Sequence, residues 1–150
     1  MASWAEFAVA APEMAAAGRQ LLYQRGDGEA LLATVRDDKP PRVHPINVGI
    51  VGDGLYGLII RSSAKEADLV ADGRYALHAH VDPDSPSEFM VRGRAAIAHA
   101  NVRGDVAAGW YFTVDEGYDL FEFDIEMAVL GRRDTADHWP PIYSTWRRQR

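Results

Sequence analysis

The sequence predicts a mainly β fold, an antiparallel barrel that is closed or nearly closed. Six or seven stretches show the alternating polar and apolar pattern of strands, and turns rich in glycine, aspartate and proline separate them. Only short helical stretches lie between the strands, which disfavours a doubly wound parallel sheet. The pairs Gly26/Gly28 and Gly52/Gly54 lack the third glycine and the long helix of a dinucleotide fingerprint, so a Rossmann fold is disfavoured as well.

Two helices are expected in the first 25 residues. Ser3 is placed to cap a short helix over residues 4–8, and Pro12 suits the first turn of a second helix over about residues 13–25. The apolar positions of the second helix recur with a helical period, so this helix is expected to cover one end of the sheet.

The barrel is expected over residues 30–131, where the period changes to two. The predicted strands cover residues 30–36, 42–51, 55–61, 74–81, 88–99 and 118–130, and predicted helices cover residues 63–71 and 102–110. Pro45 lies inside the second strand and cannot donate a ladder hydrogen bond, so an edge, a bulge or an interrupted pairing is expected there.

A single domain over residues 1–150 is expected from the length. Residues 1–25 form its N-terminal helical segment and residues 132–150 its C-terminal segment. Trp139, Tyr143 and Trp146 mark a candidate edge strand in the C-terminal segment, and an interface or ring-stacking role competes with a core role for these aromatic residues.

Composition excludes several function classes. The chain has no cysteine, which removes disulfides, thiolate nucleophiles and cysteine-type metal sites. A net charge of −6 disfavours nucleic-acid binding, and no apolar stretch is long enough to span a membrane. Without a recognisable signal peptide, a cytoplasmic location is the expectation. No metal site is expected, because the pair His78 and His80 lacks the nearby carboxylate that metal-binding barrels use.

One stretch combines several features of an anion site. An apolar run ends at Arg61, two serines and a lysine follow, and Ser63 with Glu66 fits a capping box at a helix N-terminus. Such a terminus has unpaired backbone N–H groups and the positive end of the helix dipole. Two interpretations remain open: a capped surface helix with solvated cations, or a binding site for an anion that Arg61, Ser62, Ser63 and Lys65 contact.

Several short segments, in this order and spacing, resemble the pyridoxamine 5'-phosphate oxidase-like, flavin-binding split-barrel family. The matching segments are Pro41-Arg42-Val43-His44-Pro45, Asp53-Gly54-Leu55-Tyr56, Arg61-Ser62-Ser63-Ala64-Lys65-Glu66-Ala67-Asp68-Leu69, Asp72-Gly73-Arg74-Tyr75-Ala76-Leu77-His78 and Phe89-Met90-Val91-Arg92-Gly93-Arg94-Ala95. The resemblance covers residues 30–96 well and the rest of the chain loosely.

The resemblance implies a six-stranded antiparallel split β-barrel of Greek-key type that pairs as a homodimer and binds FMN between its subunits. The phosphate end of the cofactor would meet residues at the end of the third strand and the start of the helix, namely Ile60, Arg61, Ser62, Ser63 and Lys65. The isoalloxazine ring would lie along the strand that holds Arg42 and His44. This placement agrees with the anion site inferred from the residues themselves.

The resemblance also implies an oxidoreductase that acts on an unidentified small molecule. The C-terminal arginine motif of the pyridoxamine phosphate oxidases cannot be placed in this chain, so another substrate is expected. The family includes F420-dependent reductases and haem-binding members, and F420 is the alternative cofactor. A non-catalytic dimer that binds or sequesters flavin is the alternative from another functional class. No catalytic residue is assigned, because hydride or electron transfer would belong to the flavin and His44 suits a structural hydrogen bond equally well.

Overall fold

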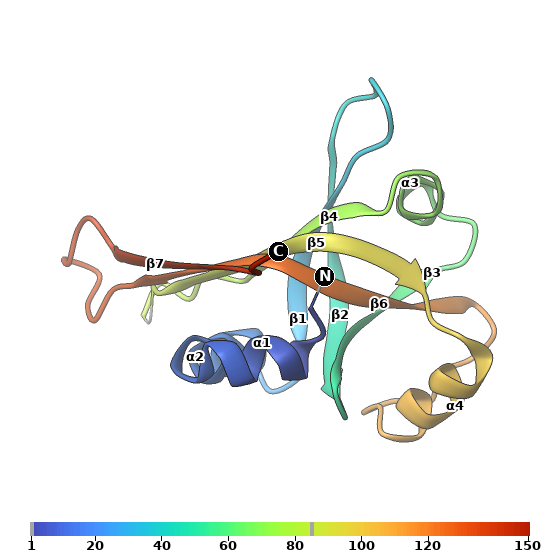
Figure 1. The fold of residues 1–150 in the computed structure, drawn as a ribbon, viewed down its shortest axis with the longest axis horizontal. Coiled ribbons are helices and arrows are strands. Elements are labelled where there is room, and N and C mark those ends of the chain that lie inside the picture. Colours follow the sequence, from blue (N-terminus) through green and yellow to red (C-terminus); the bar gives the residue numbers. More distant parts are fainter. Residues whose placement is uncertain (1, 85) are drawn as a thin grey trace.

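The computed structural model describes residues 2–84 and 86–150, which form seven strands and four short helices (Figure 1). In chain order the elements are α1 (Trp4–Ala10), α2 (Pro12–Leu22), β1 (Glu29–Thr34), β2 (Arg42–Val51), β3 (Gly54–Ile60), α3 (Ala64–Ala71), β4 (Arg74–Ala79), β5 (Glu88–Ile97), α4 (Ala100–Ala108), β6 (Tyr118–Arg132) and β7 (Ile142–Arg147). None of the helices in this described part is both long and apolar enough to cross a membrane.

Six of the strands close into an antiparallel barrel. They are ordered β3-β2-β1-β4-β5-β6, and β3 also pairs with β6, which joins the two ends of the sheet. The barrel predicted from the sequence is therefore confirmed. Strand β7 pairs only with β6, so the C-terminal aromatic segment does provide an edge strand.

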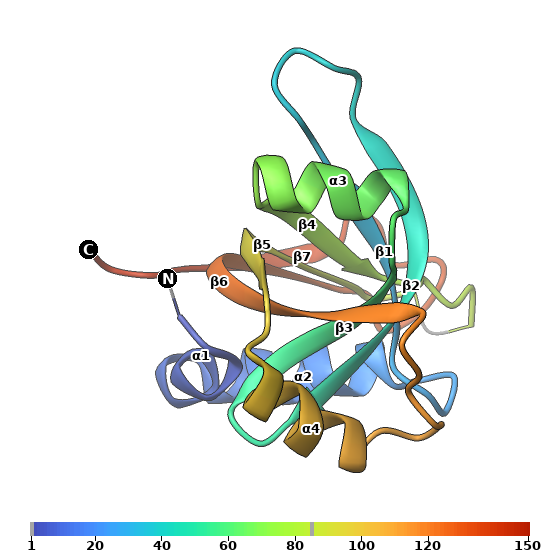
Figure 2. The same ribbon diagram turned by 90° about the vertical axis from the view of Figure 1, so that its right-hand side faces the viewer.

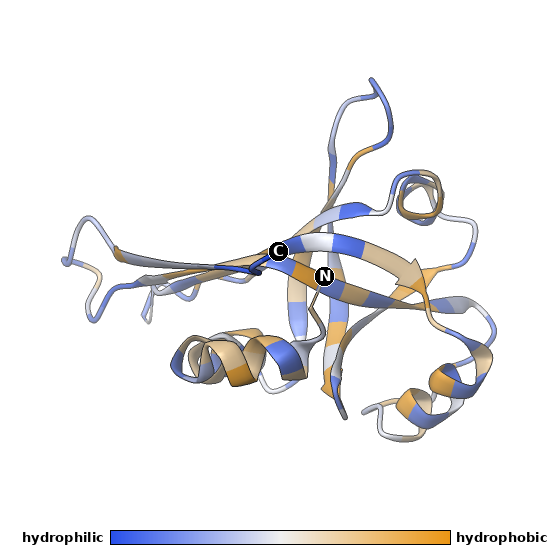
Figure 3. Cartoon of the chain, viewed as in Figure 1, coloured by the Kyte–Doolittle hydropathy of each residue, from blue (hydrophilic) through white to orange (hydrophobic). Residues whose placement is uncertain are grey.

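The alternating pattern places one face of each strand inside the barrel. In β6 the inward residues Phe121, Phe123 and Ile125 are fully buried, while Glu122 and Glu126 between and beyond them point away. Figure 3 shows the outcome along the chain: hydrophobic residues lie where strands and helices meet, and the loops that project from the barrel are mainly hydrophilic.

Helices cover the ends and one side of the barrel. Helices α1 and α2 lie together at one end and α3 lies across the other, as Figure 2 shows. Ser3 caps α1 through a complete capping box and Pro12 begins α2, both as predicted. Gly18 allows α2 to lie directly on the core, since a Cβ at this position would be 2.4 Å from the ring of Phe89.

Element ends differ from the prediction by a few residues. Helix α2 ends at Leu22 and β4 at Ala79, whereas the sequence suggested residues 25 and 81. One pair of contacts accounts for both differences: the Tyr23 hydroxyl accepts the Ile50 N–H at 2.8 Å, and the Gln24 side chain donates to the carbonyl of His80 at 2.5 Å. These tertiary hydrogen bonds hold both segments outside regular structure.

Candidate functional site

An opening separates part of β2 from β3. The two strands pair only from Val48 to Val51 on the β2 side, and beyond that point Leu58–Ile60 of β3 pair with β6 instead. The N-terminal half of β2, residues 42–47, therefore pairs with β1 alone. Pro45 lies in this half, which confirms the interrupted pairing that its missing N–H predicts. We call this unpaired stretch, bounded by residues 42–47 of β2 and residues 60–65, the opening.

Arg42 links the β2 side of the opening to α3 through a buried carboxylate. Its Nε donates to Asp68 at 3.0 Å, and the Thr34 hydroxyl donates to the same carboxylate oxygen at 2.8 Å. Arg36 lies 3.7 Å from the other oxygen. Burial alone would raise the pKa of Asp68, but the hydrogen bonds from Arg42 and Thr34 outweigh it and lower this pKa. Both Nη groups of Arg42 have no acceptor among the described residues.

His44 lies two residues further along the same face of β2. Its Nε2 atom is buried and has no hydrogen-bond partner among the described residues. Burial lowers the pKa of His44, and the positive charges of Lys65 and Arg42 lower it further, against the opposing effect of Asp68. The imidazole is therefore kept neutral near pH 7, within electrostatic range of both cations.

The far side of the opening is the junction between β3 and α3. Ser62 has a left-handed backbone (φ 67°), and Ser63 accepts the Glu66 N–H at 3.3 Å as the helix cap. The Glu66 side chain accepts the N–H of Ser62 at 3.1 Å, one residue earlier than in the predicted capping box. The N–H of Ser62, just before the helix cap, is therefore bound by a carboxylate of the protein itself.

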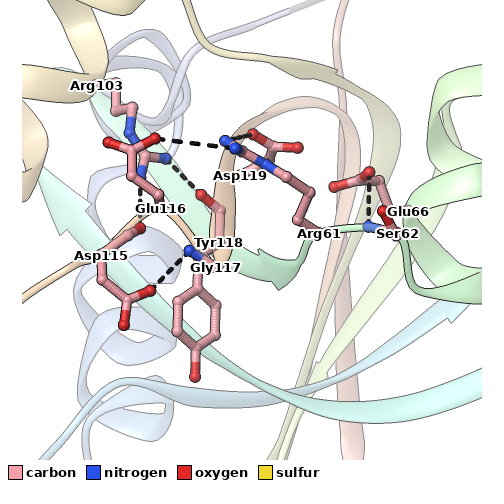
Figure 4. Close-up of polar contacts among 9 residues, drawn as sticks. All are labelled: Arg61, Ser62, Glu66, Arg103, Asp115, Glu116, Gly117, Tyr118 and Asp119. Atoms are coloured by element: carbon pink, nitrogen blue, oxygen red, sulfur yellow. Dashed lines mark hydrogen bonds and ion pairs between the residues drawn. The ribbon is translucent and has the colours of Figure 1, made fainter.

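Arg61 also binds protein carboxylates (Figure 4). It donates to Asp119 at 2.7 Å and lies 3.8 Å from Glu116, while its backbone N–H donates to the carbonyl of Gly117. The Arg61 hydrogen bond lowers the pKa of Asp119, and burial together with the Asp119 carboxylate raises the pKa of Glu66. The Arg61 guanidinium thus links the end of β3 to β6. The three carboxylates around it, Glu66, Glu116 and Asp119, outweigh its single positive charge.

Lys65 differs from Arg61 in this respect. It is half-buried in the first turn of α3 and makes no ion pair with any residue of the described part of the chain. Its charge reaches His44 across the opening. Among the cations that the sequence marked at this junction, Lys65 is the one left to bind a ligand.

The structure therefore divides the predicted site residues into two groups. Arg42, His44 and Lys65 come together at the opening. Ile60 ends β3 with its side chain exposed on the strand face that it shares with Leu58, opposite the core face of Ile59. Arg61, Ser62 and Ser63 lie at the same junction, where the Arg61 guanidinium, the Ser62 N–H and the Ser63 Oγ acceptor are bound to protein groups. Sequence reasoning missed Asp68 and Asp119, which bind the two arginines, because each partner is distant in the chain.

Comparisons with known proteins identify the fold. No family profile and no curated protein matches the chain. A NimC/NimA family protein from Clostridium acetobutylicum superposes with a TM-score of 0.63 at 15% identity, covering 89% of this chain and 94% of that one. A putative pyridoxamine 5'-phosphate oxidase from Listeria innocua gives 0.57 at 14% identity, covering 73% and 91%.

PhzG from Burkholderia lata 383, solved in complex with tetrahydrophenazine-1-carboxylic acid, gives a TM-score of 0.62 at 10% identity and covers 95% of this chain and 92% of that one. The fold of this chain is therefore the pyridoxamine 5'-phosphate oxidase-like split barrel that the resemblance predicted. At these identities the likeness is one of fold alone.

Proposed function

We propose that the chain binds FMN in the opening and acts as a flavin-dependent oxidoreductase on a small conjugated molecule. The observation that supports this most is that Lys65 and His44 lie on the two sides of the opening, each without a partner in the described part of the chain. Lys65 has no carboxylate partner among these residues, and the Nε2 atom of the neutral His44 has no hydrogen-bond partner. An anionic, ring-containing ligand satisfies both groups at once.

The donors at the opening fit FMN only in part. A phosphate monoester carries nearly two negative charges and needs charged donors, which Lys65 and the free Nη groups of Arg42 provide. Ile60 is 53% exposed and offers an apolar contact for the ring. A phosphate at Arg61 would have to compete with Asp119 and Glu116. The hydroxyl groups of Ser62 and Ser63 donate to no residue of the described part of the chain and are further candidate donors for the phosphate.

When bound, the isoalloxazine would supply the hydride or electron chemistry. The residues of the chain would bind and orient it. Lys65 and Arg42 neutralise the phosphate, and His44, kept uncharged by burial and by these cations, accepts or donates one hydrogen bond through Nε2. We assign no proton transfer to any residue.

F420 is the alternative cofactor. Its acidic tail is longer than the phosphate of FMN, so it requires more cations along the groove. Besides Arg42 and Lys65, the described basic residues near the opening include Arg36, which lies against Asp68, and Arg61, which Asp119 and Glu116 neutralise. This distribution of charge favours FMN.

A homodimer completes the proposal, and the outer face of the sheet supports it. Leu31, His78, Met90 and Val129 are cross-strand neighbours on β1, β4, β5 and β6. All four are half-buried, and none of them belongs to a core cluster of the described residues. A mainly apolar row of this kind, running across four strands, suits a subunit interface.

The visible spectrum of the purified protein is the first test. Bound FMN gives flavin absorbance that NAD(P)H or another reductant bleaches, whereas bound haem gives a Soret band. A colourless protein that takes up neither FMN nor F420 would refute the cofactor proposal. Bound flavin without turnover of any reductant would favour the non-catalytic, flavin-sequestering alternative.

A further inference from the structure

Three consecutive aromatic residues, Trp110, Tyr111 and Phe112, lie across the outer side of the opening. They follow α4 and precede the loop that leads into β6. Helix α4 and this segment cover the outer face of β3 in a second apolar cluster that includes Tyr56, Leu58 and Trp110.

One end of the segment is fixed to β2. The Trp110 ring lies against Gly49, where a Cβ would be 2.6 Å from the indole. The Tyr111 hydroxyl donates to the carbonyl of Gly28 at 3.0 Å. Burial raises the pKa of Tyr111 to about 12, against a smaller lowering by a hydrogen bond with Asn47, which belongs to the half of β2 that pairs with β1 alone.

The other end of the segment lies beside β3 and β6. The Phe112 ring is 6.5 Å from that of Tyr118, and Tyr118 is the β6 partner of Ile60. The segment thus runs from the β2 side of the opening to the residue that ends β3. Arg103 fixes the loop that follows by donating to the carbonyls of Asp115 and Tyr118, both at 2.8 Å.

The two outer rings form a corner. Tyr111 stacks on Trp110 at an interplanar angle of 20°, whereas Phe112 stands at 83° to Tyr111 with ring centroids 5.2 Å apart. Tyr111 and Phe112 remain 40% and 36% exposed, although a buried cluster lies directly behind them. A fixed corner of this kind presents one ring face and one ring edge, the two arrangements in which aromatic rings attract each other.

We propose that Tyr111 and Phe112 form a stacking surface for the planar conjugated ring of the substrate, next to the flavin. We call these two residues the aromatic corner. The proposal rests on the proposed function, since the corner borders the opening assigned to FMN. A flat, conjugated compound gains ring contacts from both residues, while a saturated compound of the same size does not.

The test uses phenazine-1-carboxylate as the probe, titrated into the oxidised protein as purified and followed by calorimetry. Loss of one stacked ring costs about 1–3 kcal/mol, so Phe112→Ala is expected to weaken the probe roughly 5- to 150-fold. Phe112→Leu keeps apolar volume without the ring and is expected to lose most of the same affinity. Val9→Ala removes an 84% exposed apolar side chain on α1, outside the aromatic corner, and is the control, with no change expected.

Flavin content and sedimentation of each variant separate the possible outcomes. Weaker probe binding in both Phe112 variants, with flavin content and oligomeric state unchanged, supports the aromatic corner. Three results would overturn it: unchanged probe binding in the Phe112 variants, an equal loss of probe binding in Val9→Ala, or Phe112 variants that lose flavin or the dimer while probe binding is unchanged. A colourless wild-type protein that still binds the probe through Phe112 would refute the flavin proposal and leave the aromatic corner standing.

Discussion

At the level of single residues, the two cations of the β3–α3 junction have different electrostatic surroundings. Arg61 donates to Asp119 and lies near Glu116, while Lys65 has neither as a partner. A ligand phosphate that bound Arg61 would have to displace a 2.7 Å charged hydrogen bond. At Lys65 it would replace only water. The two residues therefore predict different effects on ligand binding.

Lys65→Ala is expected to weaken FMN far more than riboflavin, which has no phosphate. A hydrogen bond to a charged group contributes about 1.5–3 kcal/mol, so the Kd for FMN should rise roughly 10- to 150-fold while that for riboflavin changes less than about twofold. Quenching of flavin fluorescence on titration measures both constants. Equal losses for the two ligands would contradict the phosphate contact.

Arg61→Ala is the matched control at the same junction. Because Arg61 is bound to Asp119, its removal should leave the ratio of FMN to riboflavin affinity unchanged. A selective loss of FMN in this variant would place the phosphate at Arg61 instead and would overturn the division of the site made above.

Replacing Asp68 is expected to lower the free energy of unfolding, because Asp68 binds Arg42 and Arg36 and no ligand role is assigned to it. Asp68→Asn leaves Arg42 and Arg36 without their counter-charge, and because both guanidinium groups are partly exposed, the loss is that of a charged hydrogen bond, about 1.5–3 kcal/mol of the free energy of unfolding. Urea denaturation at pH 7 measures this difference. The control is Arg25→Ala, which removes a cation that is paired with Glu29 at the surface and should change the free energy of unfolding little.

The same substitution has a defined pH dependence. The pKa of Asp68 is lowered in the folded protein, so its carboxylate stabilises the fold above the pKa of the unfolded chain, about 3.9, and this contribution is lost as the pH falls through the lower folded value. The stabilities of the wild type and Asp68→Asn should therefore begin to approach each other below about pH 4 and become equal only when the pH is below the folded pKa. A difference that persists in acid would mean that the carboxylate charge is not its source.

At the level of elements, α4 is held to the barrel by close contact between Trp110 and Gly49. Gly49→Ala places a methyl group 2.6 Å from the indole, so either the ring or β2 must move. Overpacking of this kind costs about 1–3 kcal/mol, and tryptophan fluorescence during urea unfolding should show the loss. Probe binding at the aromatic corner should weaken with it, since Tyr111 and Phe112 follow Trp110 directly.

Gly104→Ala within α4 is the control for that prediction. A Cβ at Gly104 meets nothing within 4 Å, so the substitution should stabilise the helix by about 0.5–1 kcal/mol through the entropy of the unfolded chain. If Gly49→Ala and Gly104→Ala both lower the free energy of unfolding, the contact between Gly49 and Trp110 is not what distinguishes them, and the prediction is wrong.

The sequence predicts these elements well where the local pattern decides them. Ser3, Pro12 and Ser63 mark helix starts that the structure confirms, because capping depends on residues within one turn. Pro45 marks the interrupted pairing of β2, because a missing N–H acts at its own position. Helix and strand ends that depend on Tyr23 and Gln24 were missed, since their partners are distant in the chain.

The same distinction applies to the candidate site. Local sequence places Arg61, Ser63 and Lys65 at one junction, and the structure does bring them together. Whether each is free to bind a ligand depends on Asp119 and Glu116 in the approach to β6, which only the closure of the barrel brings near. The aromatic corner has the same origin, because Tyr111 meets the opening only after α4 folds across β3.

For the whole molecule, the outer row of Leu31, His78, Met90 and Val129 raises the question of what covers it. Four neighbouring strands contribute one residue each, and three of the four side chains are apolar. A monomer would leave this row against water, at a cost of about 25 cal/mol for each Å² of apolar surface. The homodimer proposed above removes this cost and places the row between two copies of the chain.

We therefore expect sedimentation to give a particle of twice the 16.6 kDa chain, and Met90→Glu to shift it to the monomer. A carboxylate in the middle of an apolar interface is left without a partner, which costs several kcal/mol and exceeds the margin of most interfaces. Val9→Glu alters an 84% exposed apolar residue on α1, outside the row, and should leave the dimer intact. A monomeric wild type, or a dimer that survives Met90→Glu, would show that the subunits do not meet through this row, and a cofactor shared between them would then need another interface.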